Sequence, residues 1–267
     1  TSSDGKCRAF GEGGDGYVPG EGVGSVLLKP LKKAILENDN IYAVIKGSAI
    51  NHGGRTNGYS VSNPSAQAEV IEEAINKSKI DPRTINYIEA HGTGTELGDP
   101  IEIRGLNIAF EKYTRDKHFC RIGSVKSNIG HCEAAAGIAS LTKVILQMKH
   151  RKLVPSLHSR ILNENINFKD SPFQVQHDLE EWKPVSLDNG EDVIKYPLRA
   201  GISSFGAGGS NVHLIMEEYN KAVTNEVREK QNELIVFSAK NENALLTIID
   251  SHLKLFSRDL INALDEV

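Results

Sequence analysis

Two stretches of this chain run from a short strand pattern through a glycine-rich turn into a helix pattern, and each turn carries a histidine. The first stretch, INYIEAHGTGTELGDPIEIRG, contains His91, and the second, CRIGSVKSNIGHCEAAAGIASL, contains His131. A strand, a turn and a helix that occur twice in this order predict an α/β fold. Such folds place polar groups at the carboxyl ends of strands to form active sites, so both histidines are candidate site residues.

Other segments agree with an α/β fold. The β-branched run IYAVIKGSAIN predicts a strand, and Asn63 followed by Pro64 predicts the start of a helix with one apolar face. RAGISSF and NVHLIME predict two strands on either side of a third glycine-rich turn. Further strands are expected at residues 23–29, VGSVLLK, and at residues 233–240, ELIVFSAK.

The two helices that follow the histidines have distinct start patterns. After the His91 turn, Asp99 is expected to cap a helix that has Pro100 at its first position and Glu102 three residues after the cap. His131 stands one residue before a helix pattern rich in small residues. The positive end of that helix's dipole should disfavour the charged imidazolium, so we expect a neutral His131.

Composition narrows the class of protein. The chain has 267 residues, 39% of them hydrophobic and 25% charged, as in soluble globular proteins. A formal charge of −4 and a sequence pI near 6.1 argue against a nucleic-acid partner. No apolar run approaches the length of a membrane span, so no membrane role is expected. The three cysteines form no CxxC pair, the histidines show no zinc-site spacing, and we expect a reduced, cytoplasmic protein without a metal.

The three glycine-rich segments resemble the HGTGT, KSNIGH and terminal glycine motifs of β-ketoacyl synthases, in the version carried by modular polyketide synthases. The string HGTGTELGDPIE matches the family motif residue for residue, and the resemblance covers almost the whole chain. It implies a thiolase-like layered α/β fold. It also implies three parts: the end of the ketosynthase N-terminal half (1–42), the C-terminal half (43–217), and the start of a small α/β linker subdomain that follows the ketosynthase (218–267).

The resemblance implies an acyltransferase that catalyses decarboxylative Claisen condensation. In this family an acyl chain on a cysteine is attacked by a carbanion made from a malonyl thioester on acyl carrier protein. That cysteine lies in a TACSSS-like turn, and the chain has no such sequence. We expect none of Cys7, Cys120 and Cys132 to be the nucleophile. The nucleophile is therefore expected outside this chain, which by itself should not elongate acyl chains.

Individual roles follow from the resemblance. His91 and His131 are the implied catalytic pair, which cradles the thioester oxygen as an enolate develops. For this role the two rings must converge on one thioester-sized space. Thr93 and Thr95 are implied to bind the phosphopantetheine arm, and Lys126 is implied to be a buried, paired lysine that orients the site.

The third glycine-rich turn has its own implied role. The resemblance places half of an oxyanion hole for the acyl-cysteine intermediate at the backbone amide of Ala207. Discrete fatty-acid synthases tend to carry a bulky phenylalanine there, so Ala207 implies a wider gate and tolerance of substituted acyl chains. Phe205, two residues earlier, is expected to be a packing residue.

Expected partners also come from the family. They are the N-terminal half of the ketosynthase, acyl carrier protein and, in the parent enzyme, a second copy in a homodimer. No cofactor is expected to bind directly, because the phosphopantetheine arm arrives on the carrier protein.

Three alternatives remain open. A discrete fatty-acid elongation synthase is disfavoured by Ala207 and by the continuation of the chain through residues 218–267. A synthase that passes chains on without condensing them is disfavoured by the presence of His91. A non-catalytic assembly or carrier-protein-docking fragment is supported by the missing nucleophile.

Overall fold

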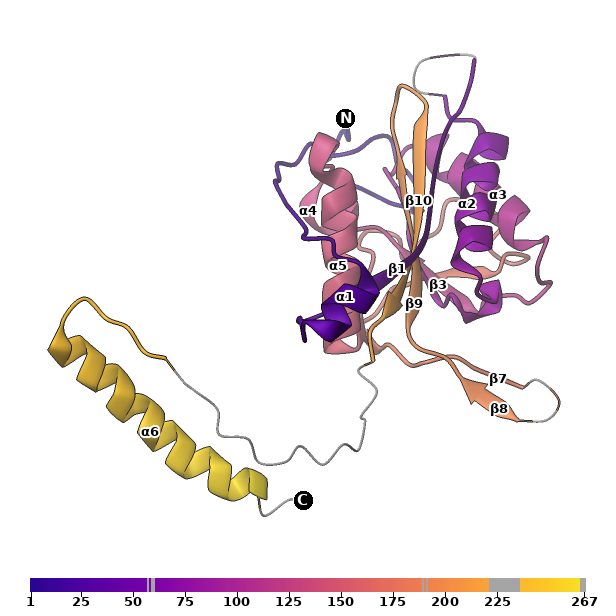
Figure 1. Ribbon diagram of the computed structural model, residues 1–267. Helices are drawn as coiled ribbons and strands as arrows, with labels where there is room; N and C mark the ends of the chain where they lie inside the picture. The colour runs from indigo at the N-terminus through magenta and orange to yellow at the C-terminus, as the bar shows by residue number, and fades with distance from the viewer. Residues whose placement is uncertain (57, 59–60, 189, 191, 221–235, 265–267) are drawn as a thin grey trace. The chain divides into compact units, whose positions relative to one another are not determined.

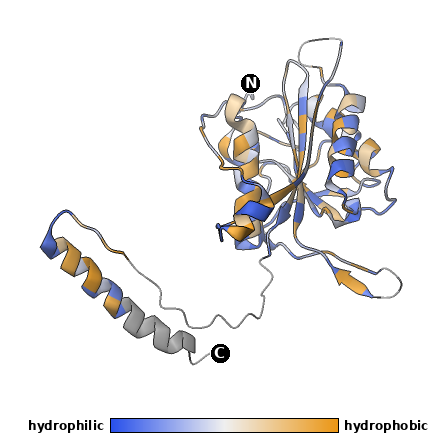
Figure 2. Cartoon of the chain, in the orientation of Figure 1, coloured by the Kyte–Doolittle hydropathy of each residue, from blue (hydrophilic) through white to orange (hydrophobic). Residues whose placement is uncertain are grey.

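The computed structural model describes residues 1–56, 58, 61–188, 190, 192–220 and 236–264, with side chains up to Lys254. The chain forms two compact units, Thr1–Lys221 and Ala222–Val267. The first unit contains every residue discussed below as a site residue. The second unit contains helix α6 (Glu242–Leu264), in which both hydrophobic and hydrophilic residues occur up to Lys254 (Figure 2).

The first unit is organised around a six-stranded mixed sheet (Figure 1). The strands β1, β10 and β9 are antiparallel, and β9, β2, β3 and β5 run parallel to one another. In the register of the sheet, Ile88 lies opposite Gly201 of β9 and Ile122 of β3. The strand order is β1 (Ala43–His52), β10 (Ser210–Glu218), β9 (Arg199–Phe205), β2 (Tyr87–Glu89), β3 (Cys120–Gly123) and β5 (Phe173–Val175).

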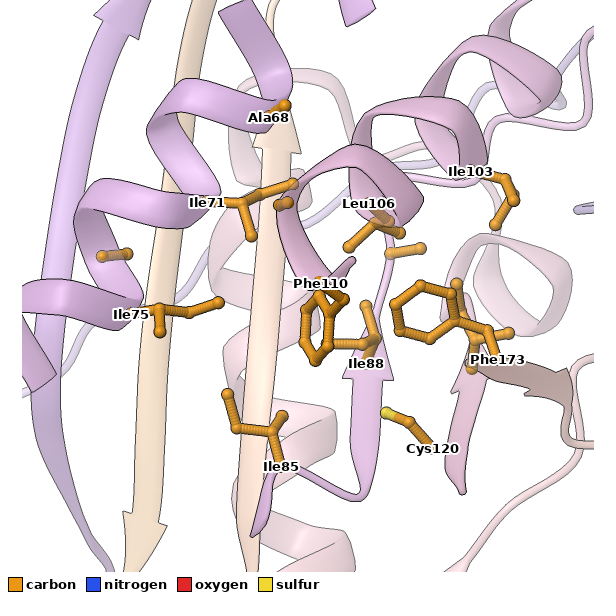
Figure 3. Close-up of a cluster of buried hydrophobic side chains, with 14 of the residues drawn as sticks. Ala68, Ile71, Ile75, Ile85, Ile88, Ile103, Leu106, Phe110, Cys120 and Phe173 are labelled. Atoms are coloured by element: carbon orange, nitrogen blue, oxygen red, sulfur yellow. The ribbon is translucent and has the colours of Figure 1, made fainter. Parts of the chain in front are cut away.

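Helices cover both faces of this sheet. The helices α2 (Pro64–Ser78) and α3 (Gly98–Phe110) lie on one face, and α5 (Ala136–His150) lies on the other (Figure 1). Adjacent residues of β2 alternate between the two cores: Ile88 packs with the α2 and α3 side chains, as Figure 3 shows, and Tyr87 packs with those of α5. The expected layered α/β fold is confirmed.

The remaining elements are short. They are α1 (Leu31–Leu36), η1 (Pro82–Thr84), α4 (Lys126–Ile129), η2 (Glu133–Ala135) and two separate two-stranded sheets, β4 (Lys152–Leu153) with β6 (Glu180–Glu181) and β7 (Ser186–Asp188) with β8 (Val193–Lys195).

The start of α2 shows why local sequence was sufficient there. The Asn63 side chain accepts hydrogen bonds from the N–H groups of Ser65 at 3.0 Å and Ala66 at 3.3 Å, and Pro64 occupies the first helical position. The apolar face of the helix is buried, with Val70 at 0% exposure. The predicted helix is confirmed.

Two predicted strands are not found. Residues 23–29 form no strand, and Val23 and Leu27 are 99% and 94% exposed. Residues 236–240 form no strand either, whereas residues 233–235 lie outside the described part of the chain. A β-branched run forms a strand only where another backbone supplies hydrogen-bonding partners. No strand in the described ranges is paired with either segment.

Candidate active site

The two histidines lie together although 40 positions separate them in sequence, as 131 minus 91 gives. His91 follows β2 and His131 follows α4. Their ring centroids are 5.4 Å apart, and the ring planes meet at 83°. Parallel pairing of β2 with β3 brings both turns to the same edge of the sheet. The two rings therefore lie next to each other, as convergence on one thioester-sized space requires.

The HGTGT turn depends on glycine for its close approach to the N-terminal segment. Gly94 has φ +72°, which disfavours other residues. A Cβ atom at this position would lie 2.7 Å from the backbone nitrogen of Arg8. The Gly94 carbonyl also accepts the N–H of Gly16 at 3.1 Å. The chain before residue 20 therefore packs directly against the turn that carries His91.

Each imidazole ring has its Nδ1 atom occupied by a backbone donor. The N–H of Phe205 donates to His91 Nδ1 at 3.3 Å, and the N–H of Glu133 donates to His131 Nδ1 at 2.9 Å. A neutral imidazole whose Nδ1 accepts a hydrogen bond carries its proton on Nε2. Each ring can thus offer one Nε2–H donor to a bound molecule.

Both histidines are held in the neutral form. Burial lowers the pKa of His91 well below its usual value, and the charges of Lys126 and His131 lower it further. Burial and Lys126 also lower the pKa of His131, against the opposing effect of Glu133.

The structure adds two causes of a neutral His131 to the expected one. The 3₁₀ turn η2 (Glu133–Ala135) begins two residues after His131 and leads directly into α5 at Ala136, and the N–H of its first residue, Glu133, donates to His131 Nδ1. Burial and the nearby Lys126 charge also lower the pKa of His131. Sequence periodicity did not separate the 3₁₀ turn from the α-helix.

Lys126 is buried at the first position of α4, with 2% of its surface exposed. Burial lowers its pKa, and the charges of Glu89, Glu102 and Asp99 act in the opposite direction. A buried ammonium surrounded by carboxylates agrees with the expectation of a buried lysine near the site. The three acids that surround it were not recognised from the sequence as its partners.

The carboxylate of Glu102 holds the backbone of the His91 turn. Its two oxygens accept the N–H groups of His91 and Gly92, each at 2.8 Å. Asp99 holds the same turn further along, since it accepts the N–H of Gly94 at 3.1 Å and that of Phe10 at 2.7 Å. Both acids are almost completely buried.

The predicted capping role of Asp99 was wrong. The helix α3 begins at Gly98 with Leu97 as its cap residue, and neither Leu97 nor Asp99 caps it with a side-chain hydrogen bond. Asp99 and Glu102 are three residues apart and therefore share one helical face. That spacing, directly after a glycine-rich turn, is the signal that could have revealed two anchors for the turn rather than a capping box.

These two buried acids lead to a pH-dependent prediction. Burial raises the pKa of Asp99 from 3.8 to about 6 and that of Glu102 from 4.5 to about 7. Between pH 4.5 and 7 the folded state therefore binds more protons than the unfolded chain, so its free energy of unfolding falls as pH rises. We expect the wild-type protein to lose a few kcal/mol relative to Glu102→Gln over this range, at about 1.4 kcal/mol per pKa unit. Urea denaturation at a series of pH values measures this, and a pH-independent difference would contradict it.

The two threonines of the HGTGT turn lie side by side. Their Oγ1 atoms are 3.2 Å apart, and Thr95 Oγ1 also accepts the N–H of Gly98 at 3.1 Å. Thr95 therefore supports the start of α3, whereas the Thr93 hydroxyl contacts only Thr95 among the hydrogen bonds of the described residues.

The third glycine-rich turn joins the histidine site through Phe205. The Phe205 ring centroid is 5.8 Å from that of His91, and the side chain is buried, as expected for a packing residue. Ala207 is exposed in the turn between β9 and β10. Within the described ranges its N–H has no hydrogen-bond partner, so it remains available as a donor.

The three cysteines lie in the protein interior. Cys7 is 2% exposed and its Sγ accepts the N–H of Val18 at 3.0 Å, Cys120 is completely buried, and Cys132 is 6% exposed. Burial raises the pKa of Cys7 and of Cys120, which disfavours the nucleophilic thiolate. These positions are consistent with a nucleophile supplied from elsewhere.

The described residues lack two kinds of feature. They contain no group of three histidine, cysteine or acidic side chains placed to hold a metal ion. Among their helices, none combines the length and the apolar character that a membrane crossing requires.

Comparison with known families assigns almost the whole chain. Residues 42–160 match the family described as "Beta-ketoacyl synthase, C-terminal domain", and residues 163–267 match "Ketoacyl-synthetase C-terminal extension". Residues 1–34 match "Beta-ketoacyl synthase, N-terminal domain". These matches follow one another along the sequence.

Curated relatives are polyketide synthases. The chain is 64% identical to polyketide synthase PksL of Bacillus subtilis strain 168 over 247 residues, which cover 91% of this chain and 5% of PksL. It is 53% identical to polyketide synthase ThaG of Burkholderia thailandensis over 255 residues, 92% of this chain and 4% of ThaG. The chain thus spans a small fraction of each relative.

Solved structures with the same fold are ketosynthases. The oxazolomycin ketosynthase domain OzmH KS7 of Streptomyces albus JA3453 is 47% identical, with a TM-score of 0.79, 91% of this chain covered and 41% of that one. The ketosynthase from module 6 of the bacillaene synthase of Bacillus subtilis 168 is 41% identical, also with a TM-score of 0.79, and 96% and 43% are covered. The chain therefore belongs to the β-ketoacyl synthase family and forms part of a ketosynthase domain of the polyketide synthase type.

Proposed function

We propose that this chain supplies the catalytic histidines of a ketosynthase that performs decarboxylative Claisen condensation on carrier-protein thioesters. The observation that carries the proposal is the pair of neutral imidazoles, His91 and His131, with ring centroids 5.4 Å apart and both Nδ1 atoms occupied by backbone N–H groups. This arrangement leaves two Nε2–H donors available for one carbonyl oxygen.

The reaction uses these donors when charge develops on that oxygen. The bond between the carboxylate and the α-carbon of the malonyl thioester breaks, CO₂ leaves, and the bonding electrons form an enolate. Hydrogen bonds from His91 and His131 stabilise the enolate oxygen. The enolate carbon then attacks the acyl thioester, a tetrahedral oxyanion forms, and the cysteine sulfur leaves as a thiolate. The free N–H of Ala207 is the proposed donor to that oxyanion.

Lys126 supports this chemistry through charge rather than proton transfer. Its ammonium lowers the pKa of both histidines, so neither takes the proton that would convert a hydrogen-bond donor into a full cation. The buried acids around it offset its own charge. Lys126 is therefore a positioning residue in this proposal.

Partners and a cellular location are also proposed for the parent enzyme. The nucleophilic cysteine comes from the N-terminal half of the ketosynthase, and the malonyl group arrives on the phosphopantetheine arm of acyl carrier protein, with no directly bound cofactor. The parent enzyme is a cytoplasmic homodimer. The chain is divided into the end of the ketosynthase N-terminal half (1–42), the C-terminal half (43–217) and the start of the linker subdomain (218–267). The small side chain of Ala207 is proposed to admit substituted acyl chains.

The test is reconstitution of the complete ketosynthase domain with this chain as its C-terminal part. Incubation with an acyl thioester and malonyl-carrier protein is expected to give a β-ketoacyl product, detected by mass spectrometry, whereas the 267-residue chain alone gives none. A complete domain that binds carrier protein but neither loads nor extends an acyl chain would support the docking-fragment alternative and contradict the proposal.

The proposed role of Thr93 leads to a specific kinetic prediction. Loss of its hydroxyl in Thr93→Val removes one hydrogen bond to the pantetheine arm, worth about 1 kcal/mol. The KM for malonyl-carrier protein is then expected to rise about 5- to 10-fold with kcat unchanged, because ground state and transition state lose the same contact. Thr114→Val, beyond the end of α3, is the matched control. A fall in kcat at constant KM would show that Thr93 acts elsewhere in the reaction.

A further inference from the structure

A buried ion pair lies next to the two histidine turns, and the mechanism above uses only its carboxylate, as one of the acids around Lys126. Glu89 is the last residue of β2, two positions before His91, and is completely buried. Lys143 belongs to α5, the helix that follows the His131 turn, and is also buried. Its Nζ atom is 2.7 Å from Glu89 Oε2. Burial of two charges carries a large desolvation cost, which makes a purely stabilising role a weak explanation.

The Glu89 carboxylate also holds the segment that leads to His131. Its Oε1 atom accepts the N–H of Val125 at 2.6 Å, and its Oε2 atom accepts the hydroxyl proton of Tyr87 at 2.7 Å. Val125 immediately precedes α4, which ends at Ile129 and is followed by Gly130 and His131. One carboxylate therefore ties the strand before His91 to the segment before His131.

Lys143 extends this connection to the helix that follows His131. The ammonium also lies over the Tyr87 ring, 5.6 Å from its centroid. Gly123 leaves space for the cluster, because a Cβ atom there would lie 3.0 Å from the Tyr87 hydroxyl and 3.6 Å from Lys143 Nζ. Glu89 of β2 thus contacts both the segment that leads into α4 and the helix α5 that follows His131.

Glu89 is shared between two buried cations. It is the carboxylate with the largest influence on Lys126, ahead of Glu102 and Asp99. Lys143 occupies the other side of the same carboxylate. A change in the Glu89–Lys143 pair therefore alters both the position of the turns and the charge that Lys126 senses.

We propose that Glu89 and Lys143 form a positioning pair that holds the His91 and His131 turns at the separation needed for condensation. The inference rests on the proposed function, since condensation is the step in which both histidines act together. Acyl transfer to the cysteine does not require both histidines to donate to one oxygen. The rate of acyl loading is therefore the internal reference against which the condensation rate is compared. A loss of alignment of about 1 Å costs about 100-fold in rate.

The experiment uses Glu89→Gln, Lys143→Met and the double variant in the complete ketosynthase domain. Each single variant leaves one buried charge without its partner and is expected to lower the melting temperature, whereas the double variant removes both charges and recovers much of it. We expect condensation to stay about 10- to 100-fold below wild type in the double variant, with acyl loading near the wild-type rate. Lys143→Arg, which keeps the charge, is expected to retain more condensation activity than Lys143→Met.

A surface ion pair provides the matched control. Lys112 Nζ and Glu72 Oε2 are also 2.7 Å apart, but Lys112 is 57% exposed, so Glu72→Gln and Lys112→Met are expected to change neither step. Recovery of condensation together with stability in the double variant would overturn the inference. An equal loss of loading and condensation would overturn it as well.

Crystal structures of the wild-type and double-variant domains give a readout that does not depend on activity. We expect the separation of the His91 and His131 rings, 5.4 Å in the wild type, to change in the double variant. If the wild-type domain makes no product, the proposed function fails while the ring positions still test the inference. Unchanged ring positions would then overturn it.

Discussion

Replacement of His91 or His131 by alanine in the complete ketosynthase domain is expected to lower the condensation rate by about 10²- to 10³-fold. Each variant removes one of the two Nε2–H donors that the proposed mechanism assigns to the enolate oxygen, and loss of a single preorganised donor of this kind has an effect of that size. Acyl loading is expected to continue, because in the proposed mechanism it uses the cysteine of the N-terminal half and does not require both histidine donors. Single-turnover assays that follow loading and β-ketoacyl product separately measure both steps.

A surface histidine provides the control for this experiment. His158 is exposed and has φ +61°, which asparagine tolerates, so His158→Asn is expected to leave both steps unchanged. The double variant of His91 and His131 is expected to lose less than the product of the two single effects, since the rings act on one oxygen. Wild-type condensation in either single variant would remove the basis of the proposed mechanism.

Glu102→Ala is expected to show the largest effect of any single change outside the histidine pair. It leaves the N–H groups of His91 and Gly92 buried without acceptors, at about 1–3 kcal/mol for each group. Release of a buried carboxyl with a raised pKa offsets part of this cost, so we expect a net loss of about 2–4 kcal/mol in the free energy of unfolding. The His91 turn then loses its anchor, and condensation is expected to fall about 100-fold.

Two comparisons make this result interpretable. Glu111→Ala changes an exposed glutamate next to the end of the same helix and should alter stability by less than about 0.5 kcal/mol. Glu102→Gln keeps one acceptor and should fall between alanine and wild type in urea denaturation at pH 4.5, before the raised pKa of Glu102 lowers the stability of the wild type. A Glu102→Ala protein with wild-type stability and activity would show that the turn keeps its conformation without the carboxylate.

Much of the fold could be predicted because its signals are local. The cap at Asn63 and the following proline act within one helical turn, and their prediction was correct. The strand at residues 23–29 could not be judged in the same way, because a strand requires a second backbone. Apolar, β-branched residues alone did not indicate whether that backbone was present.

Those residues of the site that lie within contiguous sequence motifs could be predicted. His91, His131 and Lys126 each lie inside a recognisable string, and the structure brings the histidines together as that reading required. Asp99 and Glu102 were noticed but interpreted as helix-start residues, since their partners are backbone N–H groups of a preceding turn. Glu89 and Lys143 gave no signal, because 54 positions separate them, as 143 minus 89 gives.

By itself the sequence determined the family, the two strand–turn–helix segments and the identity of the two imidazoles, because each of these depends on residues within a short distance along the chain. Only the tertiary structure decided which nitrogen of each ring carries the proton, which acids hold the turns, and why the histidines stay neutral. Those properties arise from hydrogen bonds and charges between segments that are distant in sequence, in a buried environment that exists only once the sheet and its helices have packed.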